Sequence, residues 1–259
     1  MNIFIMTDIE GISGVDTGEV WDSTSEAYKE GVLRLMEDTN AAIEGAFRAG
    51  ADRVLVYDGH GGGKNFIKEM LDKRAEQVTD YDMPGLFNDC KAFLMIGLHA
   101  KAGTRCAFLD HTQSSKNWYN YYINGKTYGE LAQEAAYCGA YGVPVVMASG
   151  DEAACREAME MIPGIECAVV KKAEGRMRAH SIELDKAHAL ITEAVVRGIT
   201  KADSIAPFRP ALPMELKVEY TYTHICDEVM RGTNRLERVD GRTVRRTVDK
   251  IQKFGDVLP

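Results

Sequence analysis

Nearly uninterrupted apolar runs alternate along the chain with longer segments whose apolar positions recur at helical spacing. Three such runs occupy residues 2–7, 53–57 and 92–97. Apolar runs of this length predict strands that are buried on both faces of a sheet. The segment 23–50 is predicted to be a long helix that begins at a Ser23–Glu26 capping box and ends at Gly50.

The rest of the chain continues this alternation. Further strands are expected at residues 106–109, 118–123, 144–148, 166–170 and 215–222, and further helices at 65–73, 127–141, 151–161 and 183–197. An Asn124–Gly125 pair predicts a tight hairpin turn. The pattern predicts an α/β protein with a largely parallel central sheet, helices on both faces and a smaller C-terminal α+β lobe. We expect residues 1–175 to form the core and residues 176–259 the lobe of the same unit.

Composition and charge narrow the classes of function. The 259 residues are 45% hydrophobic and carry a formal net charge of −8, so nucleic acid is disfavoured as a partner. The start of the chain has no cationic leader, and no apolar run approaches the roughly 18 residues of a membrane helix. The six cysteines are scattered without a Cys-x-x-Cys pair, which is typical of reduced thiols. We therefore expect a cytoplasmic protein without a membrane partner.

Two carboxylates follow the first predicted strand. Asp8 and Glu10 are two positions apart, so in extended chain both point to the same side. Two carboxylates at such a short distance repel each other unless one is protonated or a cation lies between them. The pair is a candidate metal site, although a solvated strand end and a helix cap would give the same two residues.

Three histidines lie at or beyond the ends of the next strands. His60 is in a glycine-rich loop, His99 directly follows a strand, and His111 comes twelve residues later. The loop around His60 fits neither the phosphate-binding nor the dinucleotide-binding glycine motif, and the chain lacks the Gly-x-Ser-x-Gly of esterases. Strand ends converge in an α/β sheet, and imidazoles combine with carboxylates at the divalent metals of hydrolases. Each histidine alone is equally consistent with a structural hydrogen bond.

Glu130 has two interpretations. Thr127 and Glu130 are spaced as a capping box at the start of the predicted helix 127–141, which alone favours a capping role. The other interpretation places Glu130 with the carboxylates and histidines described above.

Several stretches resemble one enzyme family, the zinc-dependent D-aminopeptidases associated with bacterial dipeptide-transport operons. The opening stretch 7–14, Thr-Asp-Ile-Glu-Gly-Ile-Ser-Gly, resembles that family's Ser-x-Asp-x-Glu-Gly signature. Asp-Gly-His at 58–60 resembles its Asp-Ser-His, with Gly59 in place of the serine, and Gly-Leu-His-Ala-Lys-Ala at 97–102 resembles its Gly-Tyr-His-Ala-Arg-Ala. Ile-Asn at 123–124 and Gly-Glu-Leu at 129–131 agree as well, so the resemblance spans at least residues 1–172 in order and spacing.

The resemblance implies a binuclear zinc metallopeptidase that releases N-terminal, D-configured amino acids from short peptides by means of a zinc-activated water. It implies that the metal ligands are Asp8, Glu10, His60, His99 and Glu130, with Asp8 bridging two zinc ions, and that His111 is the catalytic histidine. Residues 1–175 are then the metal-binding catalytic core. The family's members assemble as rings, which implies a homo-oligomer.

Two other interpretations share these residues. A two-metal amidase or phosphoesterase that acts on a non-peptide small molecule would use the same centre, because such centres also serve phosphate esters. The second is a non-enzymatic metal-binding or peptide-binding protein. A purely structural metal site leaves no coordination position open, whereas five ligands together with His111 are typical of a catalytic centre.

Overall fold

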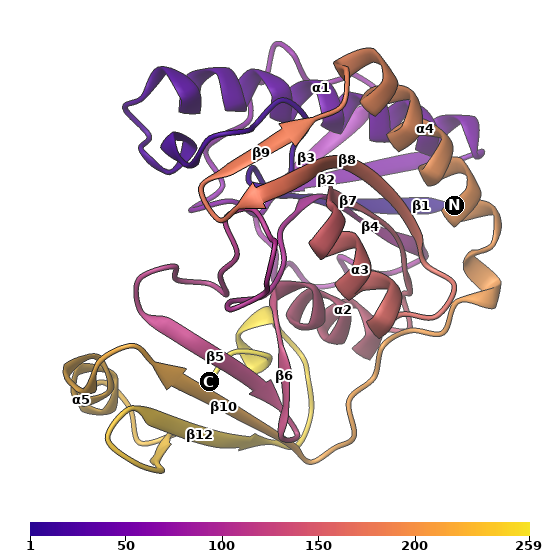
Figure 1. The fold of residues 1–259 in the computed structure, drawn as a ribbon. Helices are drawn as coiled ribbons and strands as arrows, with labels where there is room; N and C mark the ends of the chain where they lie inside the picture. Colours follow the sequence, from indigo (N-terminus) through magenta and orange to yellow (C-terminus); the bar gives the residue numbers. More distant parts are fainter.

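The computed structural model describes residues 1–259 and contains two sheets (Figure 1). The larger sheet has the strand order β3-β2-β1-β4-β7-β8-β9. Its strands are β1 (Asn2–Thr7), β2 (Arg53–Asp58), β3 (Ala75–Val78), β4 (Cys90–Leu98), β7 (Val145–Asp151), β8 (Glu166–Gly175) and β9 (Arg178–Ser181). All neighbouring pairs are parallel except β8 and β9. The predicted α/β class and the largely parallel sheet are therefore confirmed.

Helices cover both faces of the larger sheet. The long helix α1 (Glu26–Arg48) packs against α4 (Leu184–Thr200) on one face, and α2 (Glu130–Ala140) and α3 (Glu152–Met161) lie on the other (Figure 1). The central strands β1, β4 and β7 are buried along nearly their whole length, as their apolar runs predict. Burial from both sides fixes the positions of the strand ends, and these ends carry the candidate residues.

The second sheet is antiparallel and forms the lobe. Its order is β11-β12-β10-β5-β6. These strands are β5 (Trp118–Ile123), β6 (Lys126–Tyr128), β10 (Met214–Tyr220), β11 (Glu237–Arg238) and β12 (Thr243–Val248), with the helix α5 (Thr223–Arg231) beside them. The sheet draws strands from both sides of residue 175, whereas β9 and α4 belong to the larger sheet and its helix layer. The division into residues 1–175 and 176–259 remains a prediction about domains, and the two sheets do not follow it.

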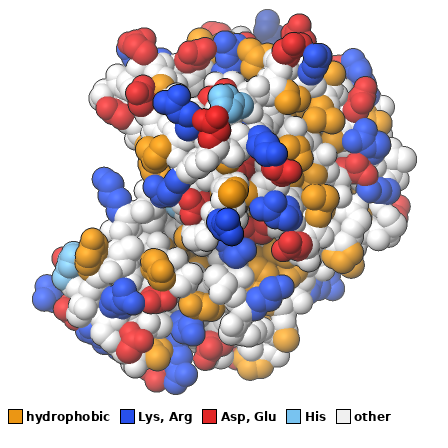
Figure 2. Space-filling model, in the orientation of Figure 1, with side chains coloured by type: hydrophobic (Ala, Val, Ile, Leu, Met, Phe, Trp, Pro, Cys, Tyr) orange, Lys and Arg blue, Asp and Glu red, His pale blue; other side chains and the backbone are white.

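Three short 3₁₀ helices complete the fold: η1 (Gly18–Trp21), η2 (Ala202–Ser204) and η3 (Phe254–Asp256). Figure 2 shows the lobe separated from the main body by a notch, with charges of both signs interspersed over this face. No helix is both long enough and apolar enough to cross a membrane.

Some predicted elements were wrong, mostly at their ends. The cap of α1 is Ser25, whose side chain accepts a hydrogen bond from the Tyr28 amide, so the predicted Ser23–Glu26 capping box does not form. Residues 65–73 form an irregular segment with turns instead of a helix. Residues 106–109 form a loop in which Cys106 and Leu109 have positive φ angles of 54° and 51°, far from the extended backbone of a strand.

The hairpin prediction was correct in its turn and wrong in its continuation. Asn124 and Gly125 both have positive φ angles, of 49° and 79°, as the tightest hairpin turn requires. The segment after the turn continues as β6, paired with β5, and α2 begins only at Glu130. Pairing of Thr127 with Tyr122 therefore takes precedence over its use as a helix cap.

Candidate metal centre

The two acidic residues leave β1 at the carboxyl edge of the larger sheet, where its parallel strands end. The Asp8 amide donates to Ile96 O of β4 at 2.8 Å, and the Gly11 amide donates to Gly97 O at 2.8 Å. Gly97 has a φ of 81°, and a Cβ at this position would lie 2.0 Å from Asp8 O. A glycine is therefore required where the backbone of Asp8 crosses β4. Asp8 and Glu10 are 7% and 1% exposed.

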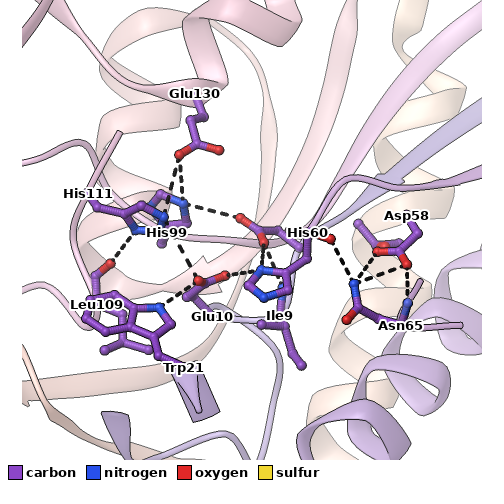
Figure 3. A network of polar contacts seen from close by, with 12 residues as sticks. Ile9, Glu10, Trp21, Asp58, His60, Asn65, His99, Leu109, His111 and Glu130 are labelled. Carbon is purple, nitrogen blue, oxygen red and sulfur yellow. Dashed lines mark hydrogen bonds and ion pairs between the residues drawn. The ribbon is translucent and has the colours of Figure 1, made fainter. Parts of the chain in front are cut away.

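His60 lies between these carboxylates. Its Nδ1 is 3.0 Å from Asp8 Oδ1 and 3.1 Å from Glu10 Oε2 (Figure 3). The Asn65 side chain donates to His60 O at 2.8 Å and to Asp58 Oδ1 at 2.9 Å, which fixes the loop around His60. A Cβ at Gly59 would lie 2.7 Å from Met6 Sδ, so the absence of a side chain at residue 59 leaves room for the methionine of the neighbouring strand.

His99 joins Asp8 to Glu130. His99 Nε2 lies 3.2 Å from Asp8 Oδ2 and 3.3 Å from Glu130 Oε1. Glu130 Oε1 also accepts a hydrogen bond from the Gln113 amide at 2.7 Å. Because α2 is capped by the backbone of Gly129 and the Glu130 side chain faces His99, the capping-box interpretation of Glu130 is wrong.

His111 stacks on His99, with ring centroids 3.9 Å apart and 13° between the ring planes. Its Nδ1 is 2.8 Å from Leu109 O, which only a protonated Nδ1 can satisfy. The other nitrogen, Nε2, therefore faces the centre, 3.8 Å from Glu130 Oε1 and 4.0 Å from Glu10 Oε1. The structure thus brings together all six residues that the sequence singled out, five of which are labelled in Figure 3.

The electrostatics of the cluster require positive charge. Burial lowers the pKa of His60, but the charges of Glu10 and Asp8 outweigh burial and raise this pKa to about 11. Burial raises the pKa of Glu130, but His99 and His111 outweigh burial and lower it to about 2. Protons on the imidazoles therefore balance the carboxylates in the metal-free cluster, and bound cations would replace those protons.

The donor set fits divalent cations. Glu10 Oε2 and His99 Nε2 are sealed from solvent. Their ion-pair contacts, at 3.1 Å to His60 Nδ1 and 3.2 Å to Asp8 Oδ2, lack the geometry of hydrogen bonds. Buried polar atoms are almost always hydrogen-bonded unless they serve a ligand. Ligand atoms of Asp8, Glu10 and His99 lie within 4.8 Å of one another, as do those of His99, His111 and Glu130. Two adjoining groups of carboxylate and imidazole ligands are what a binuclear centre needs.

Trp21 is a neighbour of the centre that the sequence did not reveal. Its indole Nε1–H donates to Glu10 Oε1 at 2.8 Å, and its ring meets the His111 ring edge to face at 5.7 Å. The Arg176 guanidinium lies over the same indole, with Cζ 4.7 Å from the ring centroid. Trp21 therefore holds one oxygen of Glu10 and leaves the second oxygen directed at His60.

Replacing Trp21 by phenylalanine is expected to weaken metal binding about 10- to 100-fold, because the N–H that orients Glu10 is lost while an aromatic ring is kept. Titration of the metal-free protein with zinc and a competing chelator measures the effect. Trp118→Phe is the matched control, because Trp118 packs on Tyr121 in the second sheet. Equal zinc affinity in the two variants would contradict the assignment.

A cavity of about 580 Å³ adjoins the cluster. Asp8, Glu10, His60, His111 and Glu130 all line it, so the cluster is open to a ligand on one side. Glu134, one turn after Glu130 on α2, also lines the cavity and was missed in the sequence. Its spacing of four residues from Glu130 is the only signal that would have placed both carboxylates on one helix face.

Comparisons with known proteins agree on one family. A family model described as D-aminopeptidase matches residues 1–258. The chain belongs to the D-aminopeptidase family. A D-aminopeptidase of Bacillus subtilis (strain 168) is 32% identical to it over 225 residues, which are 85% of this chain and 81% of the relative.

A solved structure shares the fold of this D-aminopeptidase family member. That structure is described as the Zn-dependent D-aminopeptidase DppA from Bacillus subtilis, a self-compartmentalizing protease. It matches with a TM-score of 0.92 and 29% identity, over 100% of this chain and 95% of that chain. The predicted family, α/β fold and aminopeptidase activity are confirmed, and the amidase or phosphoesterase alternative is not favoured.

Proposed function

We propose that this D-aminopeptidase family member binds two zinc ions through Asp8, Glu10, His60, His99 and Glu130, and that it releases N-terminal D-amino acids from short peptides. The observation that carries the proposal is the convergence of these five side chains with two buried ligand atoms that lack hydrogen bonds. The zinc dependence of DppA, with the same fold, supports the choice of metal.

Asp8 is the best candidate for a bridging ligand. Its Oδ1 faces His60 and its Oδ2 faces His99, so its two oxygens address the two halves of the cluster. The Ile9 amide donates to Oδ1 at 2.9 Å and keeps the carboxylate in this orientation. When bound, a pair of zinc ions would supply an activated water and stabilise the negative charge that develops on the scissile carbonyl oxygen.

His111 is proposed as the catalytic histidine. Its Nδ1–H is held by Leu109 O, and Nε2 lines the cavity beside Glu10 and Glu130. Nε2 is therefore the atom that would exchange a proton with the substrate. Two roles fit this position: His111 can give a proton to the departing amine, or it can donate a hydrogen bond to the carbonyl oxygen as negative charge develops there.

We also propose that the chain forms a closed homo-oligomer and works in the cytoplasm. The description of DppA as self-compartmentalizing, together with coverage of 95% of that chain, supports the assembly. The six cysteines are all free thiols, which suits a reducing compartment.

The activity is tested with the zinc-loaded protein on a panel of D-alanyl dipeptides, L-dipeptides and p-nitrophenyl phosphate. We expect hydrolysis of the D-dipeptides, little turnover of the phosphate ester, and loss of activity on chelation that zinc restores. Faster turnover of the phosphate ester than of any peptide would contradict the proposal. Preference for the L-dipeptides would contradict only the stereochemical part.

A further inference from the structure

The cavity beside the cluster contains a second acidic feature. Glu134 is 7% exposed and lies one helical turn beyond Glu130, with both side chains on the cavity wall. A cavity of about 580 Å³ is within the range of small-molecule sites and has room for a short peptide. Glu134 takes no part in the cluster of five proposed ligands and His111, so it needs a separate explanation.

Only one of the two carboxylate oxygens of Glu134 has a partner. The Tyr81 hydroxyl donates to Oε2, and Oε1 makes no hydrogen bond. Oε1 is not sealed off from solvent, and the residue lines the cavity. No lysine, arginine or histidine forms an ion pair with Glu134, although Lys116 lines the same cavity. Glu134 is therefore a buried carboxylate without a countercharge.

Such a group is unfavourable in the empty protein. Burial raises the pKa of Glu134 to about 8, although the hydrogen bond from Tyr81 acts to lower it. The negative charges of Glu130 and Asp8 add to this rise. A buried charge left unpaired is retained where a ligand supplies the opposite charge. A cationic ligand with hydrogen-bond donors would supply the missing countercharge and a partner for Oε1.

An aminopeptidase substrate has such a group next to the bond that is cleaved. The α-ammonium of its first residue is positive, has three donors and is two bonds from the scissile carbonyl carbon. Given the proposed function, on which this inference rests, we propose that Glu134 Oε1 binds the α-ammonium group of the peptide. The contact would hold the first carbonyl against the centre and restrict cleavage to the N-terminal residue.

The walls around Glu134 suit this position. The rings of Tyr57 and Tyr81 stack at 4.3 Å between centroids and line the cavity together with Met6 and Phe254. Aromatic faces tolerate a nearby cation, and apolar walls exclude the water that would otherwise solvate the ammonium. Tyr81 also orients Glu134 through Oε2 and thereby leaves Oε1 for the ligand.

Glu134→Gln tests the proposal, because it removes the charge and keeps the shape of the side chain. We expect kcat/KM for D-alanyl-p-nitroanilide to fall about 10- to 100-fold, mainly through KM, with two zinc ions still bound by mass spectrometry. Competitive inhibition by D-alanine should weaken by a similar factor. Inhibition by D-lactate, which has a hydroxyl in place of the ammonium, should not change.

Glu134→Asp keeps the charge and should preserve part of the preference for D-alanine over D-lactate, which a merely structural role would not do. Glu166→Gln is the control, since Glu166 pairs with Arg197 and Lys201 at the start of β8, the opposite edge of the sheet.

Unchanged discrimination between D-alanine and D-lactate in Glu134→Gln would overturn the proposal. If Glu134→Gln does not fold, Glu134→Asp replaces it as the test. A partial loss of the discrimination in Glu134→Asp, with none in Glu166→Gln, then supports the proposal, and unchanged discrimination in Glu134→Asp overturns it. Wild-type protein that cleaves no aminoacyl anilide or peptide would instead refute the proposed function.

Discussion

Asp8→Asn is expected to abolish both metal binding and peptidase activity. The carboxylate of Asp8 faces His60 with one oxygen and His99 with the other, so an amide would present N–H donors to one half of the cluster. We expect fewer than one zinc ion per chain and a loss of more than about a thousandfold in kcat/KM, because the zinc ions supply several kcal/mol of transition-state stabilisation. Mass spectrometry of the metal content and dipeptide kinetics measure the two effects.

The control for this variant is Asp38→Asn. Asp38 is a fully buried carboxylate on α1 that accepts hydrogen bonds from Ser13 and lies outside the cluster. The Asp38→Asn substitution should lower thermal stability without removing zinc. Normal turnover by a metal-stripped Asp8→Asn protein would refute the role of Asp8.

His111→Ala is expected to separate catalysis from metal binding. His111 Nε2 is farther from the carboxylate oxygens, at 3.8 and 4.0 Å, than the corresponding atoms of His60 and His99. We therefore expect the variant to bind two zinc ions and to lose about 10²- to 10⁴-fold in kcat, the usual contribution of a positioned acid or base. Metal analysis and steady-state kinetics on the same preparation give both quantities.

His224→Ala, at the start of α5 in the lobe, is the matched control and should keep full activity. Loss of one zinc ion in His111→Ala would mean that His111 is a ligand. Its position beside His99 and Glu130 is compatible with that role. Unchanged kcat would remove His111 from the mechanism altogether.

Most of the larger sheet could be predicted from sequence because its strands are buried on both faces. The runs that became β1, β2 and β4 contain almost only apolar residues, and their short length favours buried strands over buried helices. The candidate residues followed from the strand ends, which a parallel sheet brings to one edge. The roles of these residues came from the family resemblance, since the pattern alone left structural interpretations open.

The errors have a different physical origin. Local signals such as the Ser23–Glu26 spacing and the Thr127–Glu130 spacing compete with tertiary contacts, and the contacts prevailed at both helix starts. Trp21 and Glu134 were missed because neither follows a strand. Trp21 contacts Glu10 across an irregular loop, and Glu134 contacts Tyr81 from a distant segment of the chain. Periodicity within one segment carries no information about such contacts.

The central claim is that Asp8, Glu10, His60, His99 and Glu130 together surround two zinc ions. The most direct test is a crystal structure of the zinc-loaded protein with diffraction data on both sides of the zinc absorption edge. We predict two anomalous peaks per chain, both enclosed by these five side chains, with Asp8 contacting both. A single peak, or peaks held by other residues, would contradict the account.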